Sequence, residues 1–244
     1  MTLTNLAGND GQDIGQGTGL VDEAIGKITQ HIRTNELGPG DRLPSEAELV
    51  KQMKVSRTVV REAYRSLAAM RLINLAAGKR ATVAPLDHGA MSLVIEHGVL
   101  TEQISIQQIY DVRRTIEMRT ATLASLRRTD EEASTILRHA EEMAENVDRP
   151  EQVMELDLSF HLTIAKASRN PIFAIIVGAF QGVSRQSWPV GWRSRTEESQ
   201  RTLMLDTHRG IAEAIAAGNP VKASELMGIH FDESTRVLLA AGLS

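Results

Sequence analysis

Residues 40–63 read GDRLPSEAELVKQMKVSRTVVREA, and this stretch decides the fold of the first part of the chain. Ser45 with Glu48 three residues later has the pattern of a capping box, which predicts a short helix that ends near Lys54. Ser56 is a favourable N-cap for the helix that follows. Two helices joined by a tight turn in this way are typical of a helix-turn-helix.

The sequence on either side of this stretch completes a winged helix-turn-helix over 19–85. Residues 20–35 carry apolar side chains at helical spacing, and this pattern stops at the glycines and proline of 37–40. After the last helix, the apolar runs 72–75 and 81–83 flank a short segment with glycine, lysine and arginine, which predicts a small β-hairpin.

The helix that begins at Ser56 is expected to have two different faces. Helical spacing places apolar residues on one face, at Val60, Ala63, Leu67 and Met70. The roughly opposite face carries Arg57, Thr58, Arg61 and Arg65. A basic face of this kind can be solvated surface and nothing more. Its position after a capped helix and before a hairpin with Lys79 and Arg80 favours DNA binding, because arginines at this end of a recognition helix reach base edges or phosphates.

Residues 20–85 resemble the DNA-binding domain of the GntR family. The resemblance implies that the operator, a double-stranded DNA site, is contacted by Ser56, Arg57, Thr58 and Arg61, and that Gly78 and Lys79 place the wing tip in the minor groove. Two positions depart from the family pattern: Ala47 stands where an arginine is frequent, and Arg80 stands where the wing usually has a second glycine. We expect an altered operator preference with DNA binding retained.

The composition suits a two-domain protein built mainly from helices. The chain has 244 residues, of which 42% are hydrophobic and only 3% aromatic, so aliphatic side chains must fill most of the core. It has no cysteine, which excludes disulfides, thiolate metal sites and cysteine nucleophiles. This composition fits a reducing compartment, and we expect a cytoplasmic protein.

The first residues and the charge distribution add two expectations. Residues 1–18 are polar and rich in glycine, which predicts a disordered tail and not a signal peptide. No run approaches the roughly 18 apolar residues of a transmembrane helix, so no membrane partner is expected. Residues 18–85 contain 11 Lys and Arg against 7 Asp and Glu, whereas 86–244 contain 16 against 22. A basic first domain on an acidic remainder favours a polyanionic partner for the first domain alone.

The second part of the chain is predicted to be an all-α bundle over 104–241, so that the fold class is mainly α. A linker over 86–103, with a short helix at 91–97, is expected to precede it. Proline and glycine predict breaks between helices at 149–150, 170–171, Trp188–Pro189 and 218–220. They divide it into about six helices, at 105–127, 130–147, 151–168, 171–186, 196–217 and 220–240.

Polar residues interrupt the apolar stripes of these helices. Arg113 stands where an apolar residue is expected, Asp157 and His161 lie one helical turn apart, and two further stripes contain His208 and His230. Such groups are costly to bury unless they are paired. An Asp and a His at this spacing can form an ordinary hydrogen bond, but a divalent metal would satisfy the carboxylate and the three imidazoles together. Imidazole and carboxylate ligands suit Zn, Ni, Mn, Fe or Co, and we expect Zn with the others as alternatives. The other histidines show no such partnership: His31, His88, His97 and His139.

This pattern resembles the FCD effector domain of the FadR branch of the GntR family, over about residues 90–240. The resemblance implies a metal held by Asp157, His161, His208 and His230, with a carboxylate effector that completes the coordination and pairs with Arg113. Members that bind acyl-coenzyme A lack these ligands, so hydroxy acids, sugar acids or small dicarboxylates are expected here. Arg185 is a further candidate for contacting the effector.

Two other functions fit the same residues. Asp and three His with open positions could activate water in a metal-dependent hydrolase, but no additional general base stands out and an attached DNA-binding domain makes catalysis superfluous. We therefore do not expect an enzyme. A regulator that senses the metal itself, or that holds a structural metal, is the second alternative. A homodimer that represses transcription is what the family resemblance implies.

Overall fold

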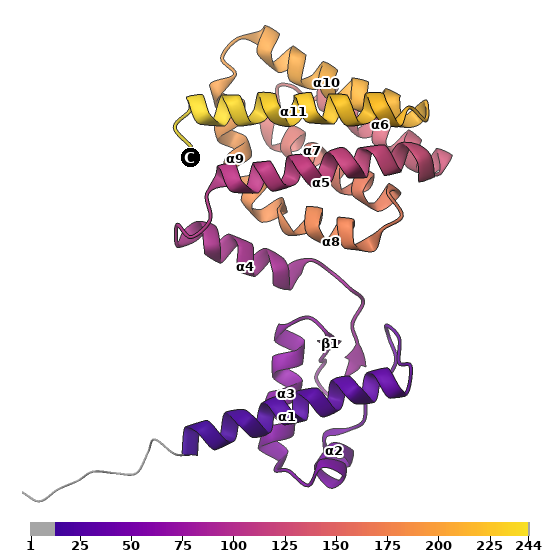
Figure 1. Cartoon of the computed structure of the whole chain (residues 1–244), viewed down its shortest axis with the longest axis vertical. Coiled ribbons are helices and arrows are strands. Elements are labelled where there is room, and N and C mark those ends of the chain that lie inside the picture. The colour runs from indigo at the N-terminus through magenta and orange to yellow at the C-terminus, as the bar shows by residue number, and fades with distance from the viewer. Residues whose placement is uncertain (1–12, 244) are drawn as a thin grey trace, which may run out of the picture. The chain divides into compact units, whose positions relative to one another are not determined.

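The computed structural model describes residues 13–243, with side chains from Gly19 onward (Figure 1). It divides into two compact units at Ala90. Residues 1–12 of the predicted tail lie outside the described residues, and the first helix already begins at Asp13. The chain is mainly α-helical, as predicted, with eleven helices and one small sheet among the described residues. None of the described helices has the length and apolar character needed to cross a membrane.

The first unit contains three helices and a two-stranded hairpin. Their bounds are α1 Asp13–Thr34, α2 Glu46–Met53, α3 Arg57–Ala69, β1 Ile73–Asn74 and β2 Thr82–Val83. The predicted capping box is present, because the Ser45 hydroxyl accepts from the backbone of Glu48 while the Glu48 carboxylate accepts from the backbone of Ser45 at 2.6 Å. Lys54 then ends α2 in the left-handed conformation, at φ 56°.

The helices of the first unit pack around a small aliphatic core. α3 buries the predicted apolar residues Val60, Ala63 and Leu67 against α1, whereas Met70 is 43% exposed and the prediction that it joins this face is wrong. Met70 follows the last helical residue, so the helical spacing no longer directs its side chain inward. The antiparallel wing pairs Ile73 with Val83. In its loop, Gly78 has φ 69°, a conformation that favours glycine.

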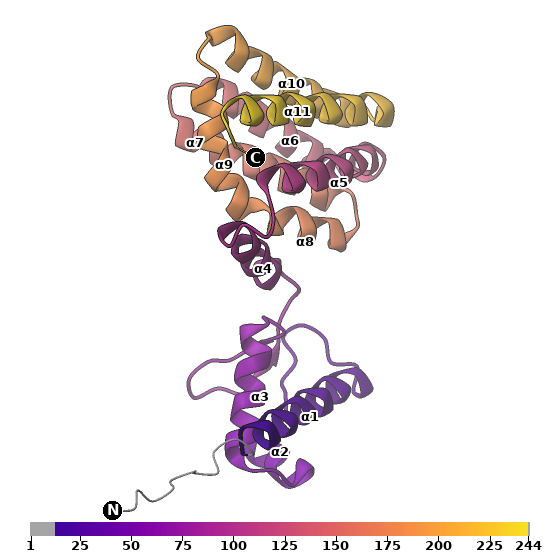
Figure 2. The same ribbon diagram turned by 60° about the vertical axis from the view of Figure 1, so that its left-hand side comes forward.

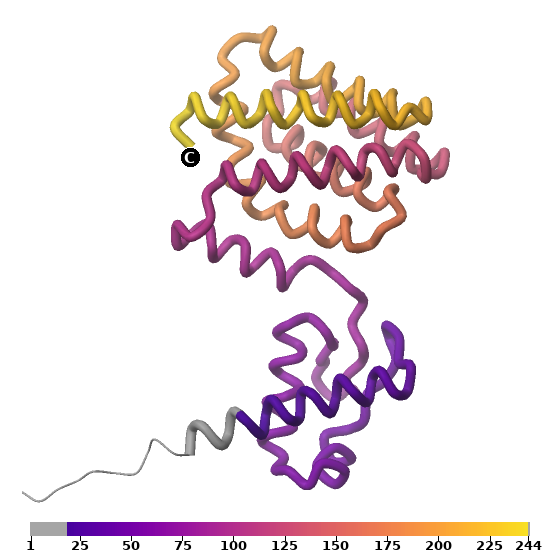
Figure 3. The backbone as a smooth tube through the Cα atoms, viewed as in Figure 1, coloured from indigo at the N-terminus to yellow at the C-terminus, as the bar shows by residue number. Residues whose placement is uncertain are grey.

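The second unit is a bundle of helices joined by short turns (Figures 1 and 2). The region predicted as a linker is largely helical. The bounds are α4 Gly89–Leu100, α5 Ile106–Arg127, α6 Asp130–Glu145, α7 Pro150–Ala167, α8 Pro171–Ala179, α9 Gln181–Ser194, α10 Glu198–Ala216 and α11 Pro220–Ala240. Figure 3 traces α5 and α11 side by side in opposite directions, and α5 also packs against α7 and α10. The core between them is aliphatic and aromatic, with Phe160, Ile164, Ile211, Ile215, Met227 and Phe231 fully buried.

The stretch predicted as a single helix over 171–186 is two helices, α8 and α9, with Phe180 between them. The predicted break at Pro189 is also wrong, because this proline lies inside α9. A proline within a helix loses one backbone hydrogen bond. The helix continues because it buries Val183 before the proline and Trp192 after it, and the burial of apolar surface offsets that loss.

Candidate metal centre and nucleic-acid interface

Four potential metal ligands converge in the interior of the second unit. Asp157 and His161 lie one turn apart on α7, His208 comes from α10 and His230 from α11. Each offers one ligand atom, and these atoms all lie within 4.8 Å of one another. All four residues are buried, with at most 8% of their surface exposed. The structure thus brings together the four residues that the sequence pattern singled out.

The orientation of two imidazoles leaves one nitrogen of each ring directed to the cluster. His208 donates from Nδ1 to the backbone carbonyl of Met204 at 2.8 Å, and its Nε2 lies 2.7 Å from Oδ1 of Asp157. His161 Nδ1 contacts the carboxylate of Glu117, while its buried Nε2 has no hydrogen-bond partner. Metal-binding histidines are held in this way, with the second ring nitrogen fixed by a carbonyl or carboxylate. The donor set and the unpartnered nitrogen fit a divalent cation such as Zn.

The protonation states that the environment imposes also suit metal binding. Burial by itself raises the pKa of Asp157, but the hydrogen bond from His208 and the charge of the neighbouring imidazoles outweigh burial and hold the pKa well below its usual range. Burial, followed by the positive charge that His208 and His161 can carry, keeps the pKa of His230 well below its ordinary value. An ionised carboxylate and a neutral imidazole, the forms favoured for Asp157 and His230, are the forms that bind metals.

Glu117 belongs to this site, and the sequence analysis missed it. It is 1% exposed, and one oxygen accepts from Arg113 Nε at 2.8 Å while the other meets His161. Burial raises the pKa of Glu117, but the charges of Arg113 and His161 lower it further than burial raises it. The available signal was its position four residues after Arg113, which places both on one helical face. Arg113 is therefore connected to the cluster through a buried carboxylate.

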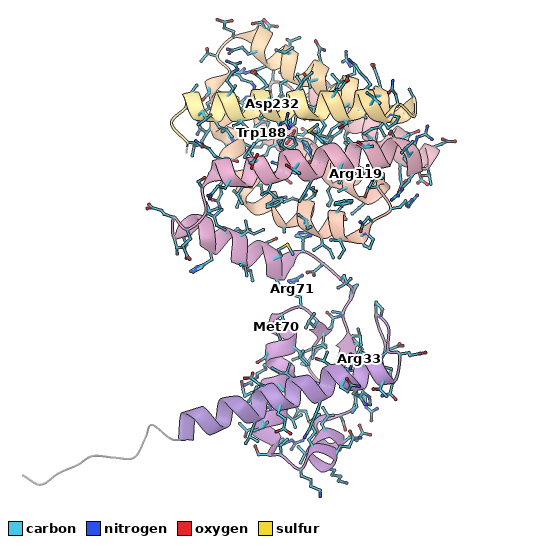
Figure 4. The ribbon with its side chains drawn as sticks, viewed as in Figure 1. Arg33, Met70, Arg71, Arg119, Trp188 and Asp232 are labelled. Carbon is cyan, nitrogen blue, oxygen red and sulfur yellow. The ribbon has the colours of Figure 1, made fainter. Side chains whose placement is uncertain are left out.

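A cavity of about 30 Å³ lies beside the cluster, with Arg113, Asp157 and His230 in its lining. Trp188, which Figure 4 labels, forms part of its wall and stacks on Trp192 with ring centres 5.0 Å apart. This volume suits about two water molecules. A larger ligand would therefore have to displace wall residues, and the tryptophan pair on α9 is the bulkiest part of that wall.

The structure places Arg185 away from this cavity, contrary to expectation. Its side chain is 45% exposed and pairs with Glu155, with Nε to Oε1 at 2.8 Å. The second arginine in the cavity lining is Arg195, which is only 5% exposed. The sequence analysis missed it because it placed residues 187–195 in a connection between helices. In the structure Arg195 is the C-cap of α9.

The residues expected to read DNA form an exposed surface on α3. The side chains of Arg57, Arg61 and Arg65 are 72%, 53% and 59% exposed, and Thr58 is exposed beside them. Ser56 is the N-cap of α3, since its hydroxyl accepts from the backbone of Val59 at 3.3 Å. A direct contact between this hydroxyl and DNA would therefore compete with its capping role.

Two carboxylates on α2 face arginines of α3 and of the wing. Glu46 lies 3.5 Å from Nε of Arg57 and 4.0 Å from Nε of Arg61. Glu48 lies 3.3 Å from Arg80 of the wing. Gly78 and Lys79 are exposed in the loop of the hairpin, whereas Arg80 is directed back toward α2. The arginines on this surface thus form ion pairs with exposed carboxylates. A DNA phosphate could replace the carboxylate in each pair.

Comparison with known proteins reveals similarity along most of the chain. Residues 20–83 match the family described as bacterial regulatory proteins, gntR family, and residues 108–233 match the FCD domain. The chain is 28% identical to the HTH-type transcriptional regulator LutR of Bacillus subtilis, over 85% of this chain and 95% of that protein. It is 30% identical to the galactonate operon transcriptional repressor of Escherichia coli, over 89% and 96%. Among solved structures, Streptococcus agalactiae GntR shares the fold with a TM-score of 0.65 at 24% identity, over 88% and 99%.

Proposed function

This chain belongs to the GntR family of bacterial regulatory proteins and carries an FCD domain, and from that premise we propose a repressor that leaves its operator when a small carboxylate binds in the second unit. As a member of this family it is a transcriptional regulator that binds DNA and a small-molecule effector, not an enzyme. The nature of the effector, the metal and the homodimer are parts of the proposal.

One observation carries the choice of a metal-assisted carboxylate site. Asp157, His161, His208 and His230 gather their ligand atoms within 4.8 Å of one another, next to a cavity that Arg113 also lines. A divalent ion bound there, with Zn favoured and Ni, Mn, Fe or Co as alternatives, would supply a positive centre that attracts the oxygens of an acid. The E. coli relative is named for a galactonate operon, and galactonate is a sugar acid.

The residues of this chain would hold and orient the acid. Arg113 donates from Nη1 to the Ser184 hydroxyl at 3.0 Å, so one side of its guanidinium is fixed by Ser184 and the other by Glu117. A guanidinium held in this way is pre-organised to receive a carboxylate. Sugar acids, hydroxy acids and small dicarboxylates are the classes that we propose.

Binding would couple to DNA release through the wall of the cavity. A cavity of about 30 Å³ cannot admit such an acid without rearrangement. The stacked pair Trp188 and Trp192 is carried by α9, so the form of the protein that accepts the acid has a displaced α9 wall. An effector that binds only this form shifts the population toward it. In a homodimer with two α3 helices on a pseudo-palindromic operator, such a shift would lower DNA affinity.

The test measures operator binding with and without metal and acid. An operator duplex selected from a random library is labelled, and its affinity is measured by fluorescence anisotropy for metal-free and Zn-loaded protein. We expect a panel of sugar acids and hydroxy acids to contain at least one that lowers the affinity of the Zn-loaded protein about 10-fold or more. The same acid should have no effect on His208→Ala.

Three other outcomes would contradict the proposal. Release by the acid from the metal-free protein would remove the metal from the mechanism. A change in DNA affinity on adding Zn alone, with no acid effect, would identify a metal sensor. Turnover of an acid or lactone by the Zn-loaded protein would indicate a metal-dependent hydrolase instead.

A further inference from the structure

Arg195 is a buried cation without an ionic partner. Its exposed fraction is 5%, and its Nη1 donates to the backbone carbonyl of Gly191 at 3.0 Å. Its Nε is buried and has no hydrogen-bond partner, and no carboxylate of residues 13–243 comes within ion-pair distance of its guanidinium. The side chain lines the same cavity as Asp157 and His230.

The charged groups around Arg195 are occupied elsewhere. Glu233 and Asp157 are the carboxylates that act on it from a distance, and Arg236 is a further cation. Glu233 pairs with Arg236 at 2.7 Å, and Oδ1 of Asp157 lies 2.7 Å from Nε2 of His208. Burial lowers the pKa of Arg195 below its ordinary value, although both carboxylates raise it. Burying a guanidinium without an ion-pair partner costs free energy. An anion from outside the chain that pairs with Arg195 would offset this cost.

The other arginine of the cavity is different in this respect. Arg113 is paired with Glu117 at 2.8 Å, so the two charges cancel within the protein. Arg195 is therefore the arginine of the cavity lining that has no ion-pair partner among the described residues. Three residues with hydroxyl groups, Tyr110, Ser187 and Ser234, also line this cavity.

From this arrangement we infer that the effector carries two anionic groups, one at the cluster of Asp157 and His230 and a second one that pairs with Arg195. The inference rests on the proposed function and narrows its effector class to diacids, such as dicarboxylates and aldaric acids. Hydroxyls on the chain between the two acid groups would meet the hydroxyl groups of the lining. A bidentate contact of the second carboxylate with a desolvated guanidinium provides the preference over a monoacid.

The experiment compares acids that differ only in the second carboxylate. The pairs are malate with 2-hydroxybutyrate, tartrate with threonate, and galactarate with galactonate. Isothermal titration of full-length, Zn-loaded protein gives the dissociation constant of each acid. We expect at least one diacid to bind about 10- to 100-fold more tightly than its monoacid partner.

Variants assign that preference to Arg195. Arg195→Gln should erase the ratio between diacid and monoacid while monoacid binding changes little, and Arg195→Lys should retain part of the ratio because it keeps the charge and loses the planar fork. Arg185→Gln is the matched control, since Arg185 is an exposed arginine of the same helix that pairs with Glu155. It should keep the full ratio.

The possible failures can be told apart. A purely structural role of Arg195, such as holding the Gly191 carbonyl, predicts that Arg195→Gln weakens both acids equally, and that result would overturn the inference. If Arg195→Gln does not fold, the ratio of diacid to monoacid affinity is measured in the wild type and in Arg195→Lys. Equal affinity of the wild type for the diacid and the monoacid would also overturn the inference. If monoacids bind and release the operator without any diacid preference, the proposed function stands and the inference alone is wrong. If none of the six acids binds, both fail.

Discussion

The two units keep their arginines in opposite environments. In the first unit, Arg57 and Arg61 are more than half exposed and have the surface carboxylate of Glu46 nearby at 3.5 and 4.0 Å. In the second unit, Arg113 and Arg195 are about 5% exposed. A surface ion pair contributes little to stability and by itself says little about function, whereas a buried guanidinium is costly wherever its charge is not matched.

This contrast shows that the two halves of the function rest on different physical evidence. The assignment of DNA binding rests on where the arginines lie in the fold, because the same arginines on any other helix would be ordinary solvated side chains. The assignment of effector binding rests on the free energy of burying charges, because a buried charge is costly unless it has a partner. Arg113 has Glu117 as that partner, and Arg195 has none within the described residues. Substitutions in each unit test this division.

The largest effect is expected from removing a ligand in the buried cluster. His208→Ala deletes the nitrogen that lies 2.7 Å from Asp157, and we expect the affinity for Zn to fall about 100-fold or more, since each ligand carries a large share of the binding free energy. Competition with a chromophoric chelator measures it. His97→Asn is the control, because His97 is exposed on α4. Equal Zn affinity in His208→Ala and wild type would show that the cluster holds no metal.

The next effect is expected on the exposed surface. Arg61→Ala removes a side chain that can reach a base edge or a phosphate, and we expect operator affinity to fall roughly 10- to 100-fold with Zn affinity unchanged. Fluorescence anisotropy with the selected operator measures it. Arg209→Ala, an equally exposed arginine of the second unit, should leave DNA binding intact. Operator binding that survives Arg61→Ala would remove this residue from the interface.

The sequence predicted local features well and distant packing poorly. The capping box at Ser45 needs only residues three positions apart. The pair Asp157 and His161 needs only one helical turn, so both patterns can be read from neighbouring residues. Convergence of His208 and His230 on that pair was predictable because each interrupts an otherwise apolar stripe.

The errors have a common physical origin. Pro189 was expected to end a helix, but burial of its neighbours in the core keeps α9 continuous to Ser194. That misplaced break removed Arg195 from consideration and left Arg185 as the candidate. Glu117 was overlooked because a glutamate on a helix is usually solvated. Its burial depends on Arg113 and on His161, and the second of these partners is distant in the sequence.

A smaller effect is expected from the carboxylate behind the cluster. Glu117→Gln keeps an oxygen for Arg113 but cannot accept from both Arg113 and His161, so the His161 ring loses its fixed orientation. We expect Zn affinity to fall about 10-fold, with operator affinity of the acid-free protein unchanged. Glu155→Gln, which alters a surface pair with Arg185, is the control. If Zn affinity is unchanged, Glu117 serves only to neutralise Arg113.

The smallest effect is expected where the comparison began, at the surface carboxylate beside the recognition helix. Glu46→Gln releases Arg57 and Arg61 from their nearest anion, and we expect DNA affinity to rise about 2- to 5-fold, in keeping with the small free energy of exposed ion pairs. The gain should shrink as salt is added, because screening already weakens the pair in the wild type. Glu23→Gln, which breaks the exposed pair with Lys27 on α1, is the control. A loss of operator affinity in Glu46→Gln would show instead that Glu46 holds the two arginines in the orientation that DNA requires. In that case the exposed arginines of α3 would be pre-organised by a carboxylate, as the buried Arg113 is.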